Sequence, residues 1–508
     1  MTENSKNYLF DGGRLKEPVA ESIRNFTSEN LSTERIKEEL ALGLRVDKAH
    51  VVMLAEQGII EKTDASAILN FLDNTQKAGP EKFCVNHTQG GTYAQIEALL
   101  IRHTGHKTGG QLHIGRSRID RMSTVSRLAT RKILLKMMKQ ALAFQEVILN
   151  KARQHTDTVM PGYTHMQHAQ PLTLGHYLSG YSERLQRDIQ RMADAFPRLN
   201  QCPLGSAALA GTSWPLNRAR TAQLLGFDQE IRNARDAGIF YKDYNLEIIS
   251  DLAILATTLS HLANEFYIWH SYEFNFIELS DAYTASSSMM PQKKNPHALD
   301  IIKSLCAYII GLPGVEFSMH RMCTSSDLDA TFSRSGVQTG GEKMLTVLDI
   351  FCGALASMQV NRKIMRRQAG AHWSTTVNLA DELTRKNKIS FRDSHKICGR
   401  FVRLAMSRNL TPCNATGALL NQAAMEIIGE PLNWDDEFVQ KALDPEQFIQ
   451  TRSTSGGTKP AETERILVQQ RKEYLKMQQW LKNLETGLES ADKELEQAVE
   501  KISIGSLI

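Results

Sequence analysis

The chain has 508 residues, enough for two to four domains, and its 60 Lys and Arg nearly balance its 56 Asp and Glu. The formal charge of +4 is spread through the sequence, so the charge pattern gives no reason to expect a nucleic-acid partner. The first residues are polar, unlike a signal peptide, and no run approaches the ~20 apolar residues of a membrane span, which predicts a cytoplasmic protein that does not act on a membrane.

The first part of the chain is predicted to be helical. Between Thr33 and Glu56, apolar residues recur near one face, as in an amphipathic helix. The stretch from Pro80 to Gly110 is richer in Gly, Thr, His and Asn and reads as turns or loops. His87 lies in this stretch, and its role is left open.

The segment 109–120 carries two arginines at alternate positions, Arg116 and Arg118, on either side of Ser117. Guanidinium groups bind carboxylates in a bidentate geometry, so this pattern suits a binding site for an acidic substrate. Surface arginines at the N-terminus of a helix would produce the same pattern. Composition alone favours the surface arginines.

Long helices are predicted in the middle of the chain. No Gly or Pro interrupts the sequence between Arg116 and Met160, and apolar residues recur there at helical spacing. Stretches free of proline also run over 172–196, 245–290 and 342–368. Long helices with apolar stripes indicate a central bundle. Because several of them are apolar on more than one face, part of their surface is expected to be buried against other subunits.

The segment 161–171 is a polar break between two of these helices and contains His165 and His168. A histidine in a loop is more often structural or solvated than catalytic, so composition alone favours a structural role for both.

The segment 283–296 reads Tyr-Thr-Ala-Ser-Ser-Ser-Met-Met-Pro-Gln-Lys-Lys-Asn-Pro. Three small serines followed by lysines and an asparagine are too polar to pack as core, and they lie between strongly helical stretches, as a mobile loop over a site would. A serine acts as a general base only where cations and hydrogen-bond donors stabilise its alkoxide, and Lys293, Lys294 and Asn295 are close in sequence. A solvated linker remains an equal alternative on composition.

Residues 281–296 resemble, without a gap, the Asp-Ala-Tyr-Ser-Thr-Gly-Ser-Ser-x-Met-Pro-Gln-Lys-Lys-Asn-Pro signature of argininosuccinate lyases, within the fumarase and aspartase superfamily. The resemblance implies that Ser287 is the catalytic base, that Ser288 contacts substrate, and that Lys293 and Asn295 bind a carboxylate.

Two further segments carry the same resemblance. Residues 162–171 are similar to the family's Gly-Tyr-Thr-His-Leu-Gln-x-Ala-Gln-Pro, which implies a catalytic His165 with Thr164 and Gln167 on the substrate side. Residues 113–120 are similar to His-Thr-Gly-Arg-Ser-Arg-Asn-Asp, which implies that Ser117 and Arg118 bind substrate carboxylates. Weaker similarity at 379–395 and 451–460 extends the resemblance to nearly the whole chain.

The chain departs from the family pattern at several positions. Ser286 replaces a glycine of the loop, and Ile119 replaces a carboxylate-binding asparagine. Asp300 stands where the family has the glutamate that pairs with the histidine. In a segment whose tyrosine, glutamine and lysine hold the substrate in the family, the aligned residues are Thr324, Asp329 and Phe332.

The resemblance implies an all-α fold of the three-domain fumarase/aspartase type. The expected domains are a mainly helical 1–118, a long-helix bundle with the catalytic loop over 119–370, and a small helical 371–508. The chain is expected to form a homotetramer with shared active sites and to need no metal or organic cofactor. The implied reaction is β-elimination of an N-substituted aspartate, argininosuccinate or a related N-succinyl amine, to fumarate and a free amine, as in arginine biosynthesis.

Two alternatives stay open. The first alternative to such a lyase is a non-catalytic structural relative, like the lens crystallins that kept this fold after losing turnover. A different superfamily reaction, such as carboxymuconate cycloisomerisation, is the other possibility. Intact Ser287, Lys293 and His165 argue against the crystallin-like alternative, and the Gln-Lys-Lys-Asn-Pro sequence favours the argininosuccinate branch over the cycloisomerase.

Overall fold

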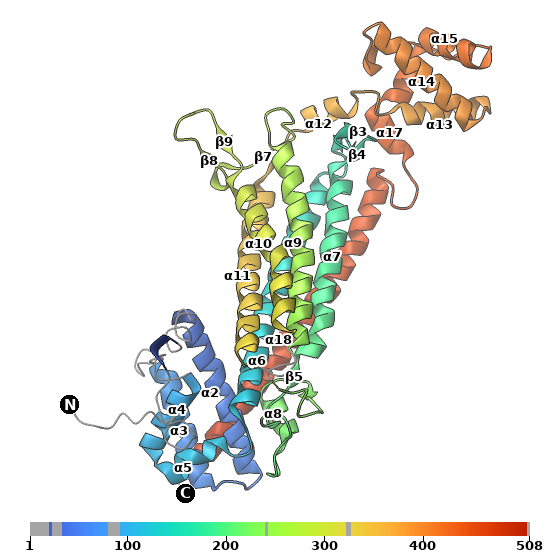
Figure 1. The fold of residues 1–508 in the computed structure, drawn as a ribbon. Helices are drawn as coiled ribbons and strands as arrows, with labels where there is room; N and C mark the ends of the chain where they lie inside the picture. The colour runs from blue at the N-terminus through green and yellow to red at the C-terminus, as the bar shows by residue number, and fades with distance from the viewer. Residues whose placement is uncertain (1–19, 23–32, 80–91, 239–241, 322–326, 505–508) are drawn as a thin grey trace.

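A bundle of long helices runs between two smaller helical lobes in the computed structural model, which describes residues 20–22, 33–79, 92–238, 242–321 and 327–504 (Figure 1). The N-terminal elements are α2 (Thr33–Glu56), α3 (Lys62–Ala78), α4 (Thr92–Thr104), α5 (His106–Gly109) and the 3-10 helix η3 (Gly110–His113). The long helices of the bundle are α6 (Arg118–Gln154), α7 (Leu174–Leu199), α9 (Asp243–Trp269), α10 (His297–Met319) and α11 (Asp327–Ser357). This architecture confirms the predicted all-α fold with a long central bundle.

The other helices form the C-terminal lobe, a short connection and a final long helix. The short helix α8 (Arg218–Leu224) follows α7. The later helices are α12 (Arg362–Ala369), α13 (Thr376–Asn387), α14 (Phe391–Ser407), η5 (Pro412–Asn414), α15 (Gly417–Ile428), α16 (Asp436–Leu443) and α17 (Pro445–Thr451). The 45-residue α18 (Pro460–Ile504) then returns along the bundle (Figure 1).

Strands in the described residues are two residues long and pair in short ribbons. The antiparallel pairs are β1 (Val159–Met160) with β4 (Leu172–Thr173), β2 (Tyr163–Thr164) with β3 (Gln167–His168), β7 (Ile277–Glu278) with β10 (Gln359–Val360), and β8 (Ala285–Ser286) with β9 (Lys294–Asn295). A parallel pair joins β5 (Gln201–Cys202) to β6 (Gln229–Glu230). The β8–β9 pair and the β2–β3 hairpin hold three of the predicted catalytic residues, Ser287, Lys293 and His165, and the fourth, Asp300, lies in α10.

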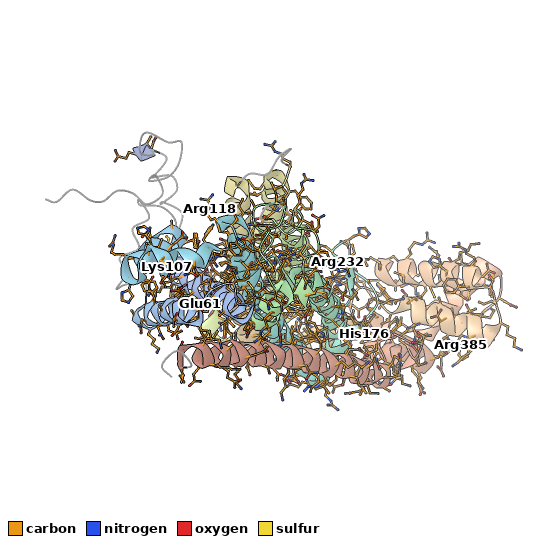
Figure 2. The ribbon with its side chains drawn as sticks, turned by 90° about the horizontal axis from the view of Figure 1, so that it is seen from below. Glu61, Lys107, Arg118, His176, Arg232 and Arg385 are labelled. Atoms are coloured by element: carbon orange, nitrogen blue, oxygen red, sulfur yellow. The ribbon has the colours of Figure 1, made fainter. Side chains whose placement is uncertain are left out.

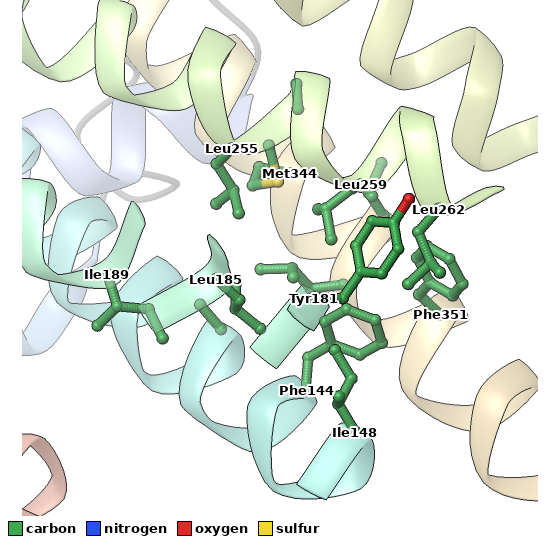
Figure 3. Close-up of a cluster of buried hydrophobic side chains, with 14 of the residues drawn as sticks. Phe144, Ile148, Tyr181, Leu185, Ile189, Leu255, Leu259, Leu262, Met344 and Phe351 are labelled. Atoms are coloured by element: carbon green, nitrogen blue, oxygen red, sulfur yellow. The ribbon is translucent and has the colours of Figure 1, made fainter. Parts of the chain in front are cut away.

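The core of the bundle is formed by apolar side chains from α6, α7, α9, α10 and α11. Figure 3 shows part of it, with side chains from α6, α7, α9 and α11. Phe144 of α6 stacks on Phe351 of α11 with ring centroids 4.9 Å apart, and Phe266 of α9 meets Phe351 edge to face at 6.1 Å. Interdigitated aromatic pairs of this kind fix the relative rotation of neighbouring helices. The bundle is therefore a rigid support for the loops at its ends.

Helix α18 packs with two different cores. Leu467, Tyr474 and Leu481 belong to the bundle core, whereas Leu495 and Val499 belong to the N-terminal core with α2 and α3. The C-terminal lobe has its own core, built from α13 to α16. The domain boundaries at 118 and 370 stay predictions, and α18 is a docking helix that lies outside the C-terminal core.

The predicted stretch 245–290 is helical only as far as Trp269, the end of α9. Ser271 ends the helix locally, because its hydroxyl donates to the Ile268 carbonyl at 2.7 Å, and Asn275 has a left-handed φ of 48°. The helix is therefore shorter than the proline-free stretch from which its length was predicted.

Helices α9 and α10 are long and apolar enough to cross a membrane by length and hydropathy alone, which corrects the expectation that no such stretch exists. Buried core helices of soluble proteins meet the same criteria. On α10, however, Tyr308, Val315 and Phe317 are 50%, 58% and 55% exposed in the single chain. The bundle thus carries an exposed apolar face of the kind that marks an interaction surface.

Asp251 of α9 is a buried carboxylate that should make stability depend on pH. It is 8% exposed, and its Oδ2 has no hydrogen-bond partner among the described residues. Burial, with the nearby charge of Glu247, raises the pKa of Asp251 to about 6. A raised carboxyl pKa stabilises the fold at low pH, and that stabilisation is lost as pH rises through the folded pKa.

We therefore expect Asp251→Asn to stabilise the protein at about pH 8 by about 2 kcal/mol and to change stability little at about pH 3, where the carboxyl is protonated in the folded and unfolded chain alike, since the substitution removes the cost of the buried charge. Thermal unfolding midpoints at both pH values measure this, with Asp194→Asn on the exposed side of α7 as the matched control. A loss of stability at the higher pH would mean that a cation from another subunit faces Asp251.

Candidate active site

The predicted substrate-binding Ser117 caps the N-terminus of α6. Its hydroxyl accepts the Ile119 amide at 3.2 Å, and the Asp120 carboxylate accepts the Ser117 amide at 2.8 Å, which completes a capping box. Arg118 begins the helix and its side chain is exposed. A helix N-terminus with an exposed arginine is suited to a carboxylate, and substrate binding by Ser117 and Arg118 stays a prediction.

The buried face of this segment is an ion cluster. Arg116 donates to Asp47 Oδ1 at 2.7 Å, and Arg121 donates to Asp47 Oδ2 at 2.8 Å. Burial opposes ionisation of Asp47, but the charges of Arg121 and Arg116 hold its pKa at about 2. Of the two arginines considered for carboxylate capture, Arg116 is therefore committed to α2, and Arg118 alone faces solvent.

Asp120 was not singled out from the sequence, yet it joins two segments. Besides its capping bond, its Oδ2 accepts the backbone amides of Gly205 at 2.9 Å and Ala207 at 3.0 Å. Asp120 is fully buried, and burial raises its pKa. Its contacts fix the small-residue loop after β5 against the start of α6.

His165 lies at the tip of the β2–β3 hairpin. His165 and its neighbour Met166 both have left-handed backbone, with φ of 54° and 59°, which is the geometry of a two-residue hairpin turn without glycine. Thr164, His165 and Gln167 are all exposed. The hairpin thus presents the three predicted residues to solvent in the single chain.

Ser287 lies in the loop between β8 and β9, and it is half-buried while Ser286 and Ser288 are exposed. Its Oγ accepts the backbone amides of Met289 at 3.3 Å and Met290 at 3.0 Å. Donors aimed at a hydroxyl oxygen favour its anionic form. Of the three serines in the run, Ser287 has the surroundings expected of a general base.

The two lysines of the loop have different environments. Lys294 pairs with Glu278 at 2.8 Å and with Asp281 at 2.7 Å, so it ties the base of the loop to β7 and to the 3-10 helix η4 (Asp281–Tyr283). Lys293 precedes it on the strand connection and is exposed, and Asn295 is half-buried. Lys293 is therefore the lysine available to a ligand.

A single chain separates these segments widely. Ser117 and Arg118 begin α6, His165 follows its far end, and a 37-residue helix is about 55 Å long. Arg118 is labelled beside the N-terminal elements and His176, close after His165 in sequence, toward the C-terminal lobe (Figure 2). Among the described residues, no hydrogen bond or ion pair joins His165 to Asp300, which is half-buried in the first turn of α10.

The described cavities lie away from the predicted site residues. Two surface cavities of about 530 and 660 Å³ lie along α18, and neither is lined by a predicted site residue. No group of three His, Cys, Asp or Glu side chains suited to a metal occurs in the part of the chain that the structure describes. Thr324 and the side chains of Asp329 and Phe332 lie outside the described residues, as does His87.

Comparison with known families gives two matches along the chain. A family model described as lyase matches residues 13–311, and one described as argininosuccinate lyase C-terminal matches residues 373–450. An argininosuccinate lyase from Methanothermobacter thermautotrophicus is 34% identical over 464 residues, covering 91% of this chain and 98% of that protein. One from Methanococcoides burtonii is 35% identical over 493 residues, covering 96% and 98%.

Solved structures share the fold. A crystal structure of EDDS lyase in complex with formate superposes with a TM-score of 0.85 at 30% identity, covering 92% of each chain, and a variant of EDDS lyase with bound fumarate matches equally well. The 3-carboxy-cis,cis-muconate lactonizing enzyme from Pseudomonas putida has a TM-score of 0.68 at 18% identity, over 89% of this chain and 98% of that one. That last likeness shows the fold alone.

Proposed function

Because the chain belongs to the argininosuccinate lyase family of the fumarase and aspartase superfamily, we propose that it is a carbon–nitrogen lyase that cleaves an N-substituted aspartate to fumarate and a free amine. The observation that carries this proposal is the position of Ser287, which accepts two backbone amides in a loop that also presents Lys293. The relatives at 30% identity and above supply the reaction class.

The reaction follows from these groups. Ser287, as the alkoxide, takes the proton from the carbon next to a carboxylate, and the C–H electrons pass into that carboxylate as an aci-carboxylate dianion. Lys293 and Asn295 stabilise the added charge. When the dianion collapses, a carbon–carbon double bond forms and the carbon–nitrogen bond breaks, so that fumarate remains. The leaving nitrogen takes a proton, for which His165 is the donor; its acidic partner would be Asp300 of a neighbouring subunit, since no hydrogen bond or ion pair joins the two among the described residues of one chain.

The substrate carboxylates would be held by Ser117 and Arg118 at the start of α6, with Thr164, Gln167 and Ser288 as further contacts. Arg118 is the exposed guanidinium of that segment, and the helix N-terminus adds its dipole.

We also propose a homotetramer in which several subunits build each site, as a soluble cytoplasmic enzyme. The length of α6 supports this, because one chain cannot bring Ser117 and His165 together around a small substrate. The exposed apolar side chains of α10 supply a surface for the contact between subunits. Burial of that surface would also account for the membrane-like hydropathy of α9 and α10.

The amine is tested by a panel of N-substituted aspartates, with fumarate release followed by ultraviolet absorbance. We expect kcat/KM for argininosuccinate to be lower by roughly tenfold or more than for the best substrate of the panel, since one lost polar contact costs about 2 kcal/mol. Ile119, in place of an asparagine, is one such loss.

Efficient cleavage of argininosuccinate, or rescue of an arginine auxotroph that lacks its lyase, would contradict the selectivity and leave the reaction intact. No fumarate from any substrate would contradict the lyase itself and favour the crystallin-like alternative.

A further inference from the structure

The hairpin that carries His165 is too short to be held by its own strands. It has two residue pairs, Tyr163 with His168 and Thr164 with Gln167, and its two turn residues are left-handed without glycine. An isolated two-stranded hairpin is marginally stable, and each left-handed residue costs of order 1 kcal/mol or more. The direction of His165 therefore depends on what packs against the base of the hairpin.

The base of the hairpin is packed by rings. Tyr163 lies 5.7 Å from Phe274, and the His168 ring meets Tyr163 edge to face at 5.0 Å. On its other side, His168 lies 4.7 Å from the ring of His372. The His168 Nδ1 is buried and has no hydrogen-bond partner among the described residues, so His168 is fixed by ring packing.

His372 belongs to the segment that leads from α12 into the C-terminal lobe. His372 and Trp373 are both left-handed, with φ of 53° and 60°, and Trp373 packs edge to face on Phe401 in the core of the lobe at 5.7 Å. The Thr375 hydroxyl donates to the Leu443 carbonyl at 2.8 Å, which fixes the same segment to α16. His372 is thus an exposed ring on a backbone held by the lobe.

We propose that His168 and His372 are positioning residues, through which the C-terminal lobe sets the direction of the His165 hairpin. The inference rests on the proposed function, because it takes His165 as the proton donor. The line of contact runs from the hairpin through His168 and His372 to Trp373 and the core of the lobe. Neither histidine touches the reacting atoms, and both act by holding the hairpin.

The test is the steady-state kinetics of fumarate release for His168→Ala and His372→Ala on the best substrate of the panel. Removing either ring frees the base of the hairpin, and a displacement of about 1 Å at a catalytic group costs up to 10²-fold, so we expect kcat to fall about tenfold or more. KM should rise by a smaller factor, because Thr164 and Gln167 lie on the same hairpin. His168→Phe keeps the ring and should restore most of kcat. His395→Ala, an exposed histidine of the same lobe, is the matched control and should leave kcat unchanged.

A second comparison tests whether the loss of kcat in these variants arises through His165. In a His165→Ala background, His168→Ala and His372→Ala should cause no further loss of kcat, because the proton donor that they position is absent. Unchanged kcat in both single variants, or the same loss in the His165→Ala background, would overturn the proposal. An unaffected His165→Ala enzyme would instead contradict the proposed role of His165. Light scattering and circular dichroism of each variant exclude loss of assembly or fold, and the exposed His372 provides a variant without a core cavity.

Discussion

Ser287→Ala should lower fumarate release by about 10²- to 10⁴-fold while substrate binding and assembly stay nearly unchanged, since it deletes the proton acceptor and creates no core cavity. The Ser287 oxygen that is lost accepts two amides, from Met289 and Met290. Because the loop is largely exposed, water can replace that oxygen as their acceptor. The loss should therefore fall on kcat and leave the fold intact.

The measurement is kcat from ultraviolet absorbance, with substrate affinity from calorimetry on the inactive variant. Ser286→Ala is the matched control, because Ser286 is the adjacent, exposed serine on β8 and should keep most of the turnover. Full activity in Ser287→Ala, together with inactivity in Ser286→Ala or Ser288→Ala, would show that the assignment of the base along the serine run is displaced.

Local periodicity predicted where the helices lie, overestimated the length of some, and said little about their packing. The stretches 245–290 and 342–368 are broken after Trp269 and after Ser357. The helix predicted over Thr33 to Glu56 has those bounds as α2, and α6 fills most of the stretch without Gly or Pro. Apolar spacing determines such helices because one face must be buried. The same pattern carries no information on which core receives the face, so the return of α18 along the bundle to the N-terminal core could not be read from the sequence.

In the candidate site, likewise, some residues could be predicted from the sequence and others could not. Motif resemblance supplied the residues that face solvent, such as Arg118 and His165. It did not supply their supports, because those depend on contacts between distant parts of the chain. Asp47 lies 69 residues from Arg116, and Asp120 meets the amides of Gly205 and Ala207 across more than 80 residues. The opposite roles of Arg116 and Arg118 follow from these contacts.

Mixing a Ser287→Ala subunit with a His165→Ala subunit should restore activity that neither variant has alone. If each site takes the serine loop from one chain and the histidine hairpin from another, random mixing in equal amounts leaves about a quarter of the sites with both groups intact. The exposed hairpin tip is the reason to expect that His165 serves the serine loop of another chain. The separation of Ser117 from His165 along α6 independently favours sites built from more than one chain.

The two variants are coexpressed with different tags and purified through both tags, and the product is sized by light scattering. Fumarate release is then measured on mixed tetramers alone. The control is a mixture of wild-type chain with the double variant Ser287→Ala/His165→Ala. Shared sites predict about a quarter of full activity in that mixture as well, whereas sites built within one chain predict about half. Sites within one chain also predict no recovery when the two single variants are mixed. Either of these results, or a fully active monomer, would place Ser287 and His165 of one site on the same chain.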